Sequence, residues 1–151
     1  MKAQILDGKK VSEDILSEVK KLVTGKSLRL AVVQVGKNEV SERYIAEKQK
    51  IGTDVGIEVK VFQLEDSISQ EGLEQEVERI GQDETIQGII VQLPLPKSIN
   101  REQVLNRIPI EKDIDVLSSR ALKEFEEGEF PVNPPTVSAV QELFTAYRID
   151  I

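Results

Sequence analysis

The chain has 151 residues, the size of one domain with a hydrophobic core, and its hydrophobic fraction of 39% argues against intrinsic disorder. With 20 basic and 27 acidic residues it carries a formal charge of −7, and it has no basic patch with interleaved aromatic residues, so we expect no nucleic-acid partner. It contains no cysteine and no histidine, which excludes disulfides, thiolate nucleophiles and a Ser-His-Asp triad. Only carboxylates remain as metal ligands, and we expect no metal. Acid–base chemistry then falls to Lys, Tyr, Asp or Glu.

The first 36 residues predict a short strand-like start, a turn at Asp7-Gly8, an amphipathic helix and a buried strand. We place the N-cap of the helix at Ser12. Residues 28–35 (LRLAVVQV) form a β-branched apolar run that ends at Gly36, which is typical of a buried parallel strand. The apolar positions of the helix recur at helical spacing: Val11, Ile15, Leu16 and Val19.

The rest of the chain continues to alternate helices and strands. The predicted segments are a helix 41–55 stopped by Gly56, a strand 57–64, a helix capped by Ser69 that ends at Ile80, a strand 86–93, a short helix capped by Asn100 that ends at Arg107, and a helix 136–147 with Val137, Val140, Leu143 and Phe144 inward. Residues 131–135 look like a rigid loop within the domain. This order predicts a single three-layer α/β/α domain with a mainly parallel sheet. No apolar run reaches the roughly 18 residues of a membrane span, and no signal peptide is visible, so we expect a cytoplasmic protein with no membrane partner.

Tyr44 and Lys48 lie four positions apart in the predicted helix 41–55 and therefore project from one face. A phenol beside an ammonium group can stack on a flat ligand and move a proton. A surface lysine beside a half-buried tyrosine explains the same spacing, and both interpretations stay open. Short-chain dehydrogenases also have this pair, but they need a glycine-rich phosphate loop, and the nine glycines here form no G-x-G-x-x-G or Walker loop.

Two further polar features follow in the chain. Gln92 stands where the strand 86–93 meets Pro94-Leu95-Pro96, so its amide is either aimed into a cleft or directed at solvent. Asp113 and Asp115 have period-two spacing, which points both the same way in an extended segment, and a solvated charge run is the alternative. Because sites of open α/β sheets form at the carboxyl ends of strands, we expect four side chains to line one cleft: Tyr44, Lys48, Gln92 and Asp115.

Two stretches are fairly specific in this order and spacing, namely Ser41-x-x-Tyr44-x-x-x-Lys48 and Val91-Gln92-Leu93-Pro94-Leu95-Pro96. With them the chain resembles the bifunctional methylenetetrahydrofolate dehydrogenase/cyclohydrolase family over nearly its whole length. The other matching segments are Ile5-Leu6-Asp7-Gly8-Lys9, Val35-Gly36, Lys50, Gly56-Ile57, Gly88-Ile89-Ile90 and Glu111-Lys112-Asp113-Ile114-Asp115.

The resemblance implies a role for each candidate residue. Lys48 is the catalytic lysine, and Gln92 orients it and helps to position the reacting one-carbon unit. Tyr44 stacks on the folate ring system, Asp115 accepts hydrogen bonds from the pterin, and Ser41 belongs to the substrate-binding residues. The residue types agree with these roles, because a carboxylate suits adjacent N–H donors and a desolvated lysine can exchange protons near neutral pH.

The resemblance also implies an activity. The family oxidises 5,10-methylenetetrahydrofolate with NADP and hydrolyses 5,10-methenyltetrahydrofolate to 10-formyltetrahydrofolate, in the one-carbon metabolism that supports purine biosynthesis. NADP binds in a Rossmann-type domain, which we expect after residue 151. Residues 1–151 are then the folate-binding catalytic domain, with no cofactor-binding residues and no dehydrogenase activity alone. We expect a homodimer for the full-length protein, whereas residues 1–151 alone are compatible with a monomer.

Three departures from the family pattern follow Asp113. The family has glycine where Val116 stands, and if that glycine has φ > 0, we expect a β-branched residue to force a different loop path. Residues 134–139 match only part of the family's Pro-Cys-Thr-Pro-x-Gly, and Ala121-Leu122-Lys123 replaces its Asn-Val-Gly. These changes leave a second hypothesis open, in which the domain binds a folate-like ligand or a partner without turnover.

Overall fold

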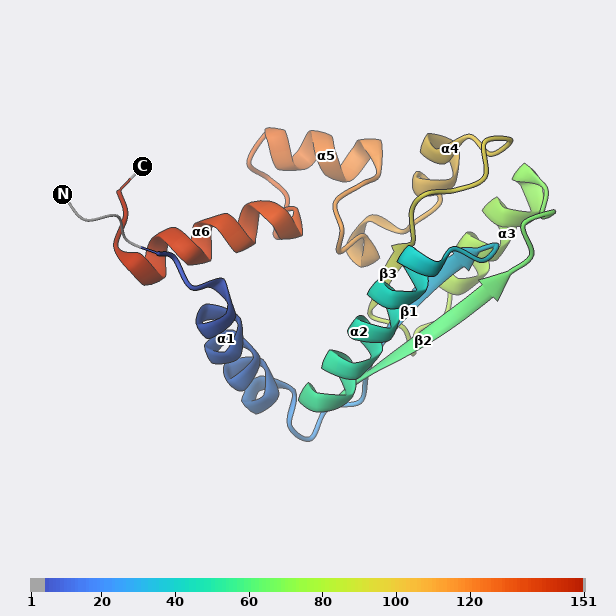
Figure 1. The fold of residues 1–151 in the computed structure, drawn as a ribbon. Helices are drawn as coiled ribbons and strands as arrows, with labels where there is room; N and C mark the ends of the chain where they lie inside the picture. The colour runs from blue at the N-terminus through green and yellow to red at the C-terminus, as the bar shows by residue number, and fades with distance from the viewer. Residues whose placement is uncertain (1–4, 151) are drawn as a thin grey trace.

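The computed structural model describes residues 5–150, in which helices and strands alternate up to residue 91 and only helices follow (Figure 1). The predicted three-layer α/β/α domain with a parallel sheet is confirmed. The elements are α1 (Gly8–Val23), β1 (Leu28–Val35), α2 (Glu39–Val55), β2 (Ile57–Leu64), α3 (Gln70–Gly81), β3 (Gly88–Val91), α4 (Arg101–Leu105), the 3₁₀ turn η1 (Ile110–Lys112), α5 (Ser119–Glu126) and α6 (Pro135–Tyr147). The expected strand-like start lies partly in residues 1–4, outside the described residues, and residues 5–7 form no strand.

β1 is the central strand of the sheet. The strand order is β2-β1-β3, and both neighbours run parallel to β1, so the carboxyl ends of all three strands meet at one edge. β3 is shorter than the predicted strand 86–93. Residue 86 belongs to a turn instead, because the Ile86 N–H donates to the Asp83 carbonyl at 3.0 Å.

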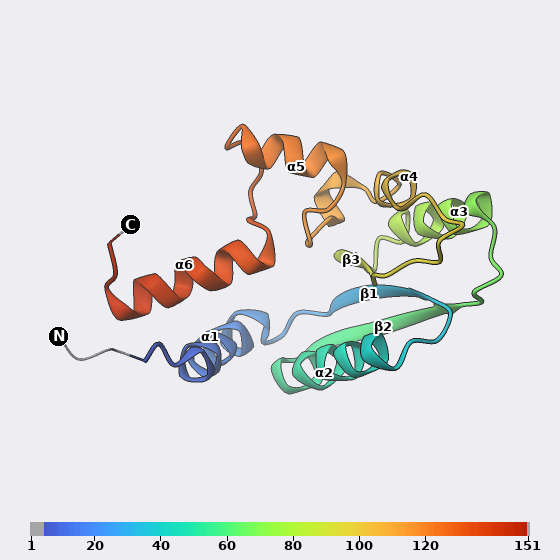
Figure 2. The same ribbon diagram turned by 45° about the horizontal axis from the view of Figure 1, so that its top comes forward.

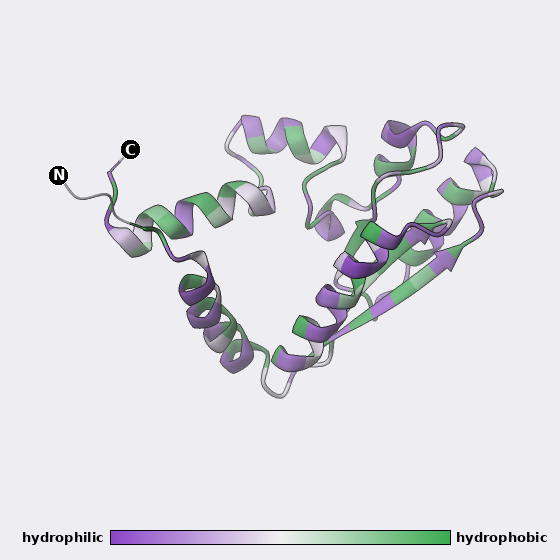
Figure 3. Cartoon of the chain, viewed as in Figure 1, coloured by the Kyte–Doolittle hydropathy of each residue, from purple (hydrophilic) through white to green (hydrophobic). Residues whose placement is uncertain are grey.

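Different helices cover the two faces of the sheet (Figure 2). α2 covers one face, where Ile45 packs with Val32 and Ile90. α3 and α4 cover the other face, and their core includes Ala31, Val33, Leu73, Val77, Ile80, Ile89, Val91, Val104 and Leu105. β2 lies at an edge and alternates hydrophobic with hydrophilic residues (Figure 3), as a half-buried strand requires.

α2 approaches β2 closely at Gly52. A Cβ atom added there would lie 2.5 Å from Cγ2 of Val59 and 2.8 Å from the carbonyl oxygen of Ile57. Neither a strand carbonyl nor a β-branched side chain can move aside easily. Glycine therefore permits a spacing between helix and strand that no other residue would allow, and this holds the helix with Tyr44 and Lys48 down on the sheet.

Side-chain caps fix where most of the helices begin. Ser69 and Asn100 cap α3 and α4 as predicted, through the Gly72 and Gln103 N–H groups. The predicted cap of α1 at Ser12 is wrong. The Asp7 carboxylate caps α1 by accepting from the N–H groups of residues 9 and 10, so the helix begins four residues before Ser12.

α1 and α6 pack against each other beside the layered core (Figure 1). The Asp7 N–H donates to the Tyr147 hydroxyl at 2.7 Å, which joins the two helices. The predicted inward face of α6 is only partly correct. Leu143 and Phe144 are half-buried, whereas Val137 is 37% and Val140 43% exposed. α1 contacts α6 near Leu143, so the first turns of α6 lie beyond that contact. No helix within residues 5–150 is long and apolar enough to cross a membrane.

α5 was not predicted. It contains Ala121-Leu122-Lys123, where the chain departs from the family pattern. Ser118 caps it by accepting from the Ala121 N–H at 3.2 Å, and Arg120 pairs with Glu124 one turn later. The segment of this chain that departs from the family's Asn-Val-Gly therefore forms a regular helix.

Candidate functional site

α2 and the end of β3 bring Lys48 and Gln92 into contact. The Nζ atom of Lys48 lies 3.4 Å from Oε1 of Gln92, and both side chains are half-buried. The Gln92 backbone N–H continues the sheet by donating to the Val33 carbonyl at 2.8 Å, and its Nε2 donates to the Leu93 carbonyl at 2.9 Å. The amide oxygen of Gln92 is thereby aimed at α2 and not at solvent.

Tyr44 and Ser41 precede Lys48 on the same helix. The Tyr44 side chain is 62% exposed, and Nζ of Lys48 lies 5.9 Å from its ring centroid. Ser41 is buried, and its hydroxyl lies 3.4 Å from the Leu93 carbonyl oxygen that it faces. α2 therefore meets the segment after β3 at two points, and it presents an exposed aromatic ring beside an ammonium group.

Asp115 reaches this region from a turn that follows η1. Its carboxyl is half-buried, and burial raises its pKa above the ordinary value. Lys48 opposes this rise in pKa, and the negative charge of Asp113 adds to it. Lys48 thus acts electrostatically on Asp115 while it contacts Gln92 and Tyr44.

The expectation that Asp113 and Asp115 lie in an extended segment and point the same way is wrong. Asp113 is 1% exposed, and its carboxylate accepts from the backbone N–H groups of Leu117 at 3.3 Å and Ser118 at 2.8 Å. A bridge to Ile89 also ties it to β3. Residues 114–115 form a turn, so Asp113 organises the loop, whereas Asp115 stands at its surface.

Val116 has φ 55°, so a β-branched residue occupies the left-handed region of the backbone. The expected difference in loop path from the family stays a prediction. The Val116 side chain is fully buried, and its N–H donates to the Asp113 carbonyl at 3.2 Å. Burial and the hydrogen bonds around Asp113 therefore outweigh a backbone strain of about 1–2 kcal/mol.

The sequence interpretation missed Gln34 in β1. It is 4% exposed and lies on the α2 face of the sheet, since Val32 two positions earlier packs with Ile45 of α2. The available signal was one amide in the otherwise apolar end of the strand, Ala31-Val32-Val33-Gln34-Val35.

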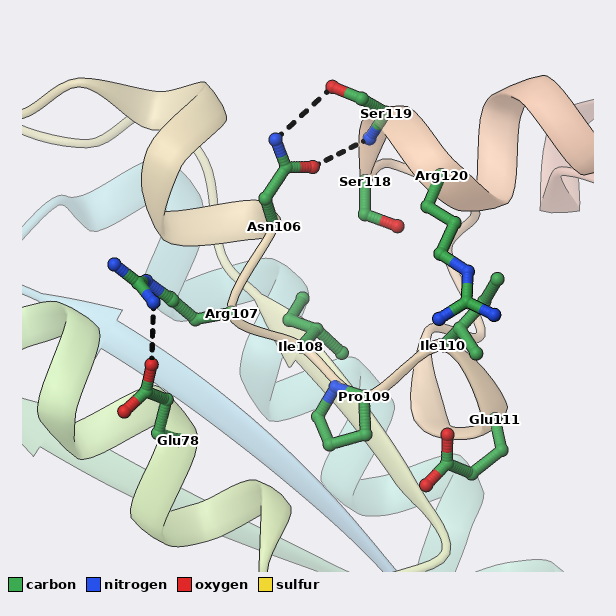
Figure 4. A pocket seen from close by; sticks show the side chains of 10 residues that line it. All are labelled: Glu78, Asn106, Arg107, Ile108, Pro109, Ile110, Glu111, Ser118, Ser119 and Arg120. Atoms are coloured by element: carbon green, nitrogen blue, oxygen red, sulfur yellow. Dashed lines mark hydrogen bonds and ion pairs between the residues drawn. The ribbon is translucent and has the colours of Figure 1, made fainter.

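A pocket of about 460 Å³ lies elsewhere, between α3, α4, η1 and the start of α5 (Figure 4). Its polar groups mostly satisfy one another. Asn106 exchanges two hydrogen bonds with Ser119, and Arg107 pairs with Glu78 at 2.9 Å. None of the predicted site residues lines this pocket.

The described residues offer little to a metal or a dinucleotide. Within residues 5–150 no group of three or more His, Cys, Asp or Glu side chains could hold a metal ion. A pyrophosphate would need a helix N-terminus free of negative charge. The helices that follow the strands instead carry acidic residues in their first turns: Glu39 and Glu42 in α2, Glu71 in α3 and Glu102 in α4.

Residues 6–115 match the family described as tetrahydrofolate dehydrogenase/cyclohydrolase, catalytic domain. The chain belongs to this family. The matched residues contain the contacts among Tyr44, Lys48 and Gln92 and extend to Asp115, and they end before α5 and α6. The resemblance inferred from the sequence motifs is thereby confirmed.

Relatives of this chain agree with the family assignment. The bifunctional protein FolD of Clostridium perfringens is 35% identical over 153 aligned positions, which cover 98% of this chain and 55% of the relative. Two solved structures are similar in fold. Bifunctional FolD from Campylobacter jejuni has a TM-score of 0.91 at 32% identity, over 97% of this chain and 54% of that one. A 5,10-methylenetetrahydrofolate dehydrogenase from the silkworm Bombyx mori has a TM-score of 0.93 at 30% identity, over 99% and 53%.

A third structure contains a cofactor. It is the methylenetetrahydrofolate dehydrogenase-cyclohydrolase (FolD) of Trypanosoma brucei complexed with NADP and an inhibitor, with a TM-score of 0.81 at 31% identity, over 95% of this chain and 50% of that one. The chain spans about half the length of these relatives.

Proposed function

We propose that this chain is the folate-side catalytic domain of an enzyme that oxidises 5,10-methylenetetrahydrofolate with NADP and hydrolyses 5,10-methenyltetrahydrofolate to 10-formyltetrahydrofolate. The observation that carries this proposal is the contact between Lys48 and Gln92, with Tyr44 on the same helix and Asp115 within electrostatic reach. An ammonium group, an amide, an exposed aromatic face and a carboxylate suit a flat, hydrogen-bonding ring substrate. The family relation supplies the identity of that substrate.

In the hydrolytic step, water attacks the methenyl carbon, and its oxygen gives up both protons as the formyl carbonyl forms. One proton goes to N5 as the bond between this carbon and N5 breaks, and the other is released to solvent. The family resemblance assigns the movement of these protons to Lys48, which contacts Gln92. Gln92 holds Nζ of Lys48 through Oε1. The exposed Tyr44 ring stacks on the substrate, Asp115 accepts from adjacent N–H groups of the pterin, and Ser41 fixes the start of α2 against Leu93.

The helices that follow the three strands disfavour the pyrophosphate of NADP, because their first turns are acidic. We therefore assign NADP binding to a Rossmann-type domain beyond residue 151 and expect no dehydrogenase activity from the chain alone. We further propose that the full-length enzyme is cytoplasmic and homodimeric, and sedimentation of that enzyme tests the dimer.

The decisive experiment measures hydrolysis of 5,10-methenyltetrahydrofolate by the purified chain. Lys48→Met should abolish the rate above background. Lys50→Met is the matched control, since Lys50 lies on the same helix, is exposed, and pairs with Glu47 at 4.0 Å. We expect weak turnover from residues 1–151 alone, because the exposed Tyr44 ring leaves this side of the site open to water. Folate binding without Lys48-dependent turnover would favour a binding module, and NADP reduction by this chain would contradict the assignment of NADP to another domain.

A further inference from the structure

One buried amide nitrogen has no hydrogen-bond partner. Among residues 5–150, Nε2 of Gln34 is the one buried side-chain nitrogen or oxygen atom without a hydrogen bond. Such a donor opposes folding, because it has left water without gaining an acceptor. It lies near the end of β1 on the α2 face of the sheet, and Gln92, which contacts Lys48, follows the neighbouring strand β3.

Gln34 is the middle member of a row of three glutamines across the sheet. In β2, Gln63 is its register partner. On the other side, Val33 pairs with Val91 and the Gln92 N–H donates to the Val33 carbonyl, so Gln92 lies opposite Gln34 one residue beyond β3. All three side chains lie on the α2 face, because the alternate residues of each strand pack with α3 and α4.

The side-chain amides of the two outer glutamines already form hydrogen bonds. Nε2 of Gln63 donates to the Gly36 carbonyl at 2.7 Å, and Nε2 of Gln92 donates to the Leu93 carbonyl at 2.9 Å. Oε1 of Gln92 accepts from Lys48 over a long 3.4 Å. An amide oxygen can accept two hydrogen bonds, so Oε1 of Gln92 has room for a second donor.

We propose that Gln34 is a positioning residue whose amide N–H group donates to Oε1 of Gln92 when substrate binds. Neighbouring parallel strands lie about 4.8 Å apart, a spacing that amide side chains on one face bridge easily. The second donor fixes the orientation of Gln92 and, through it, the position of the Lys48 ammonium group. This inference rests on the proposed function, which supplies the substrate.

Replacement of Gln34 should change the stability of the chain and its rate of catalysis in opposite directions. In the free chain Nε2 of Gln34 is buried without a partner, so Gln34→Met, which keeps the length of the side chain and removes its polar atoms, should raise the urea midpoint of unfolding. Gln63→Met is the matched control on the same face, where the amide is already bonded, and it should lower the midpoint or leave it unchanged. A lower midpoint for Gln34→Met would show that this amide has a partner in the free chain and would overturn the inference.

Turnover of 5,10-methenyltetrahydrofolate gives the second measurement. Gln34→Met should lower kcat on the order of tenfold and leave KM within about twofold, because the Lys48 group is misplaced while the substrate contacts remain. A purely structural residue would not combine a higher midpoint with a lower kcat. Lys48-dependent turnover that Gln34→Met leaves unchanged would overturn this inference alone. If wild type shows no Lys48-dependent turnover, the proposed function fails, and the midpoint still decides whether the Gln34 amide is unpaired.

Discussion

The ammonium nitrogen of Lys48 lies 3.4 Å from Oε1 of Gln92, although 44 positions separate the two residues in sequence. Replacing this amide by a carboxylate would turn the hydrogen bond into an ion pair, which holds the ammonium group more tightly. We therefore expect Gln92→Glu to lower the hydrolysis rate more than Gln92→Met does. The hydrolysis rates of both variants test this, with Gln103→Glu on α4 as the control for an added charge. Equal rates for the two Gln92 variants would show that Gln92 does not act on Lys48 electrostatically.

Asp115 links stability to pH. Its pKa is raised above the ordinary 3.8, mainly by burial, so ionisation of Asp115 opposes folding. Its contribution is most favourable below pH 3.8 and is lost as pH rises through the raised pKa. We expect Asp115→Asn to unfold at a higher urea concentration than wild type at neutral pH, and the two to converge in acid. A variant that is less stable at neutral pH would show that attraction to Lys48 outweighs burial.

Asp113 holds the loop that presents Asp115. Asp113→Ala leaves the N–H groups of Leu117 and Ser118 without an acceptor, and we expect it to lower the free energy of unfolding by about 2–4 kcal/mol. Asp113→Asn keeps one acceptor oxygen and should lose roughly half as much. Urea unfolding measures both, and the exposed Asp54→Ala should stay within about 0.5 kcal/mol of wild type.

The left-handed backbone at Val116 can be separated from the burial of its side chain. Val116→Ala and Val116→Gly both lose buried methyl groups, but only glycine removes the strain at φ 55°. We expect the glycine variant to be no less stable than the alanine variant. At the exposed helical Ala46, replacement by glycine should instead cost about 1 kcal/mol. If glycine is as much less stable than alanine at residue 116 as it is at residue 46, the loop at residue 116 does not hold a left-handed conformation in solution.

The fold was predictable wherever one local signal decided the structure. The β-branched run 28–35 has no alternative to a buried strand, and Ser69 and Asn100 stand directly before apolar helical periodicity. α1 shows where this fails. Ser12 and Asp7 are both capping residues, and only the hydrogen bonds of the Asp7 carboxylate decide between them. For α6, residue periodicity gives the apolar face, but the position of α1 determines how much of that face is covered.

For the candidate site, residue spacing and the positions of strand ends were sufficient to predict that Lys48 lies close to Gln92. The environments of Asp113, Asp115 and Val116 depend on tertiary hydrogen bonds and could not be predicted in this way. The sequence does not distinguish the roles of Asp113 and Asp115. In the structure Asp113 is buried and accepts hydrogen bonds from two backbone N–H groups, which makes it a structural residue of the loop. Valine favours extended backbone by its propensity, so the left-handed backbone of Val116 could not be predicted from the sequence.

The close approach of α2 to β2 at Gly52 has a consequence for chemistry one helical turn away. A single methyl group at residue 52 would meet Val59 and the Ile57 carbonyl, so Gly52→Ala must tilt or lift the helix. Lys48 would move with it, and the gap to Gln92 would open without a change in any residue of the site. The distance from the ammonium group to the amide therefore depends on a residue whose side-chain position faces β2 and not the candidate site.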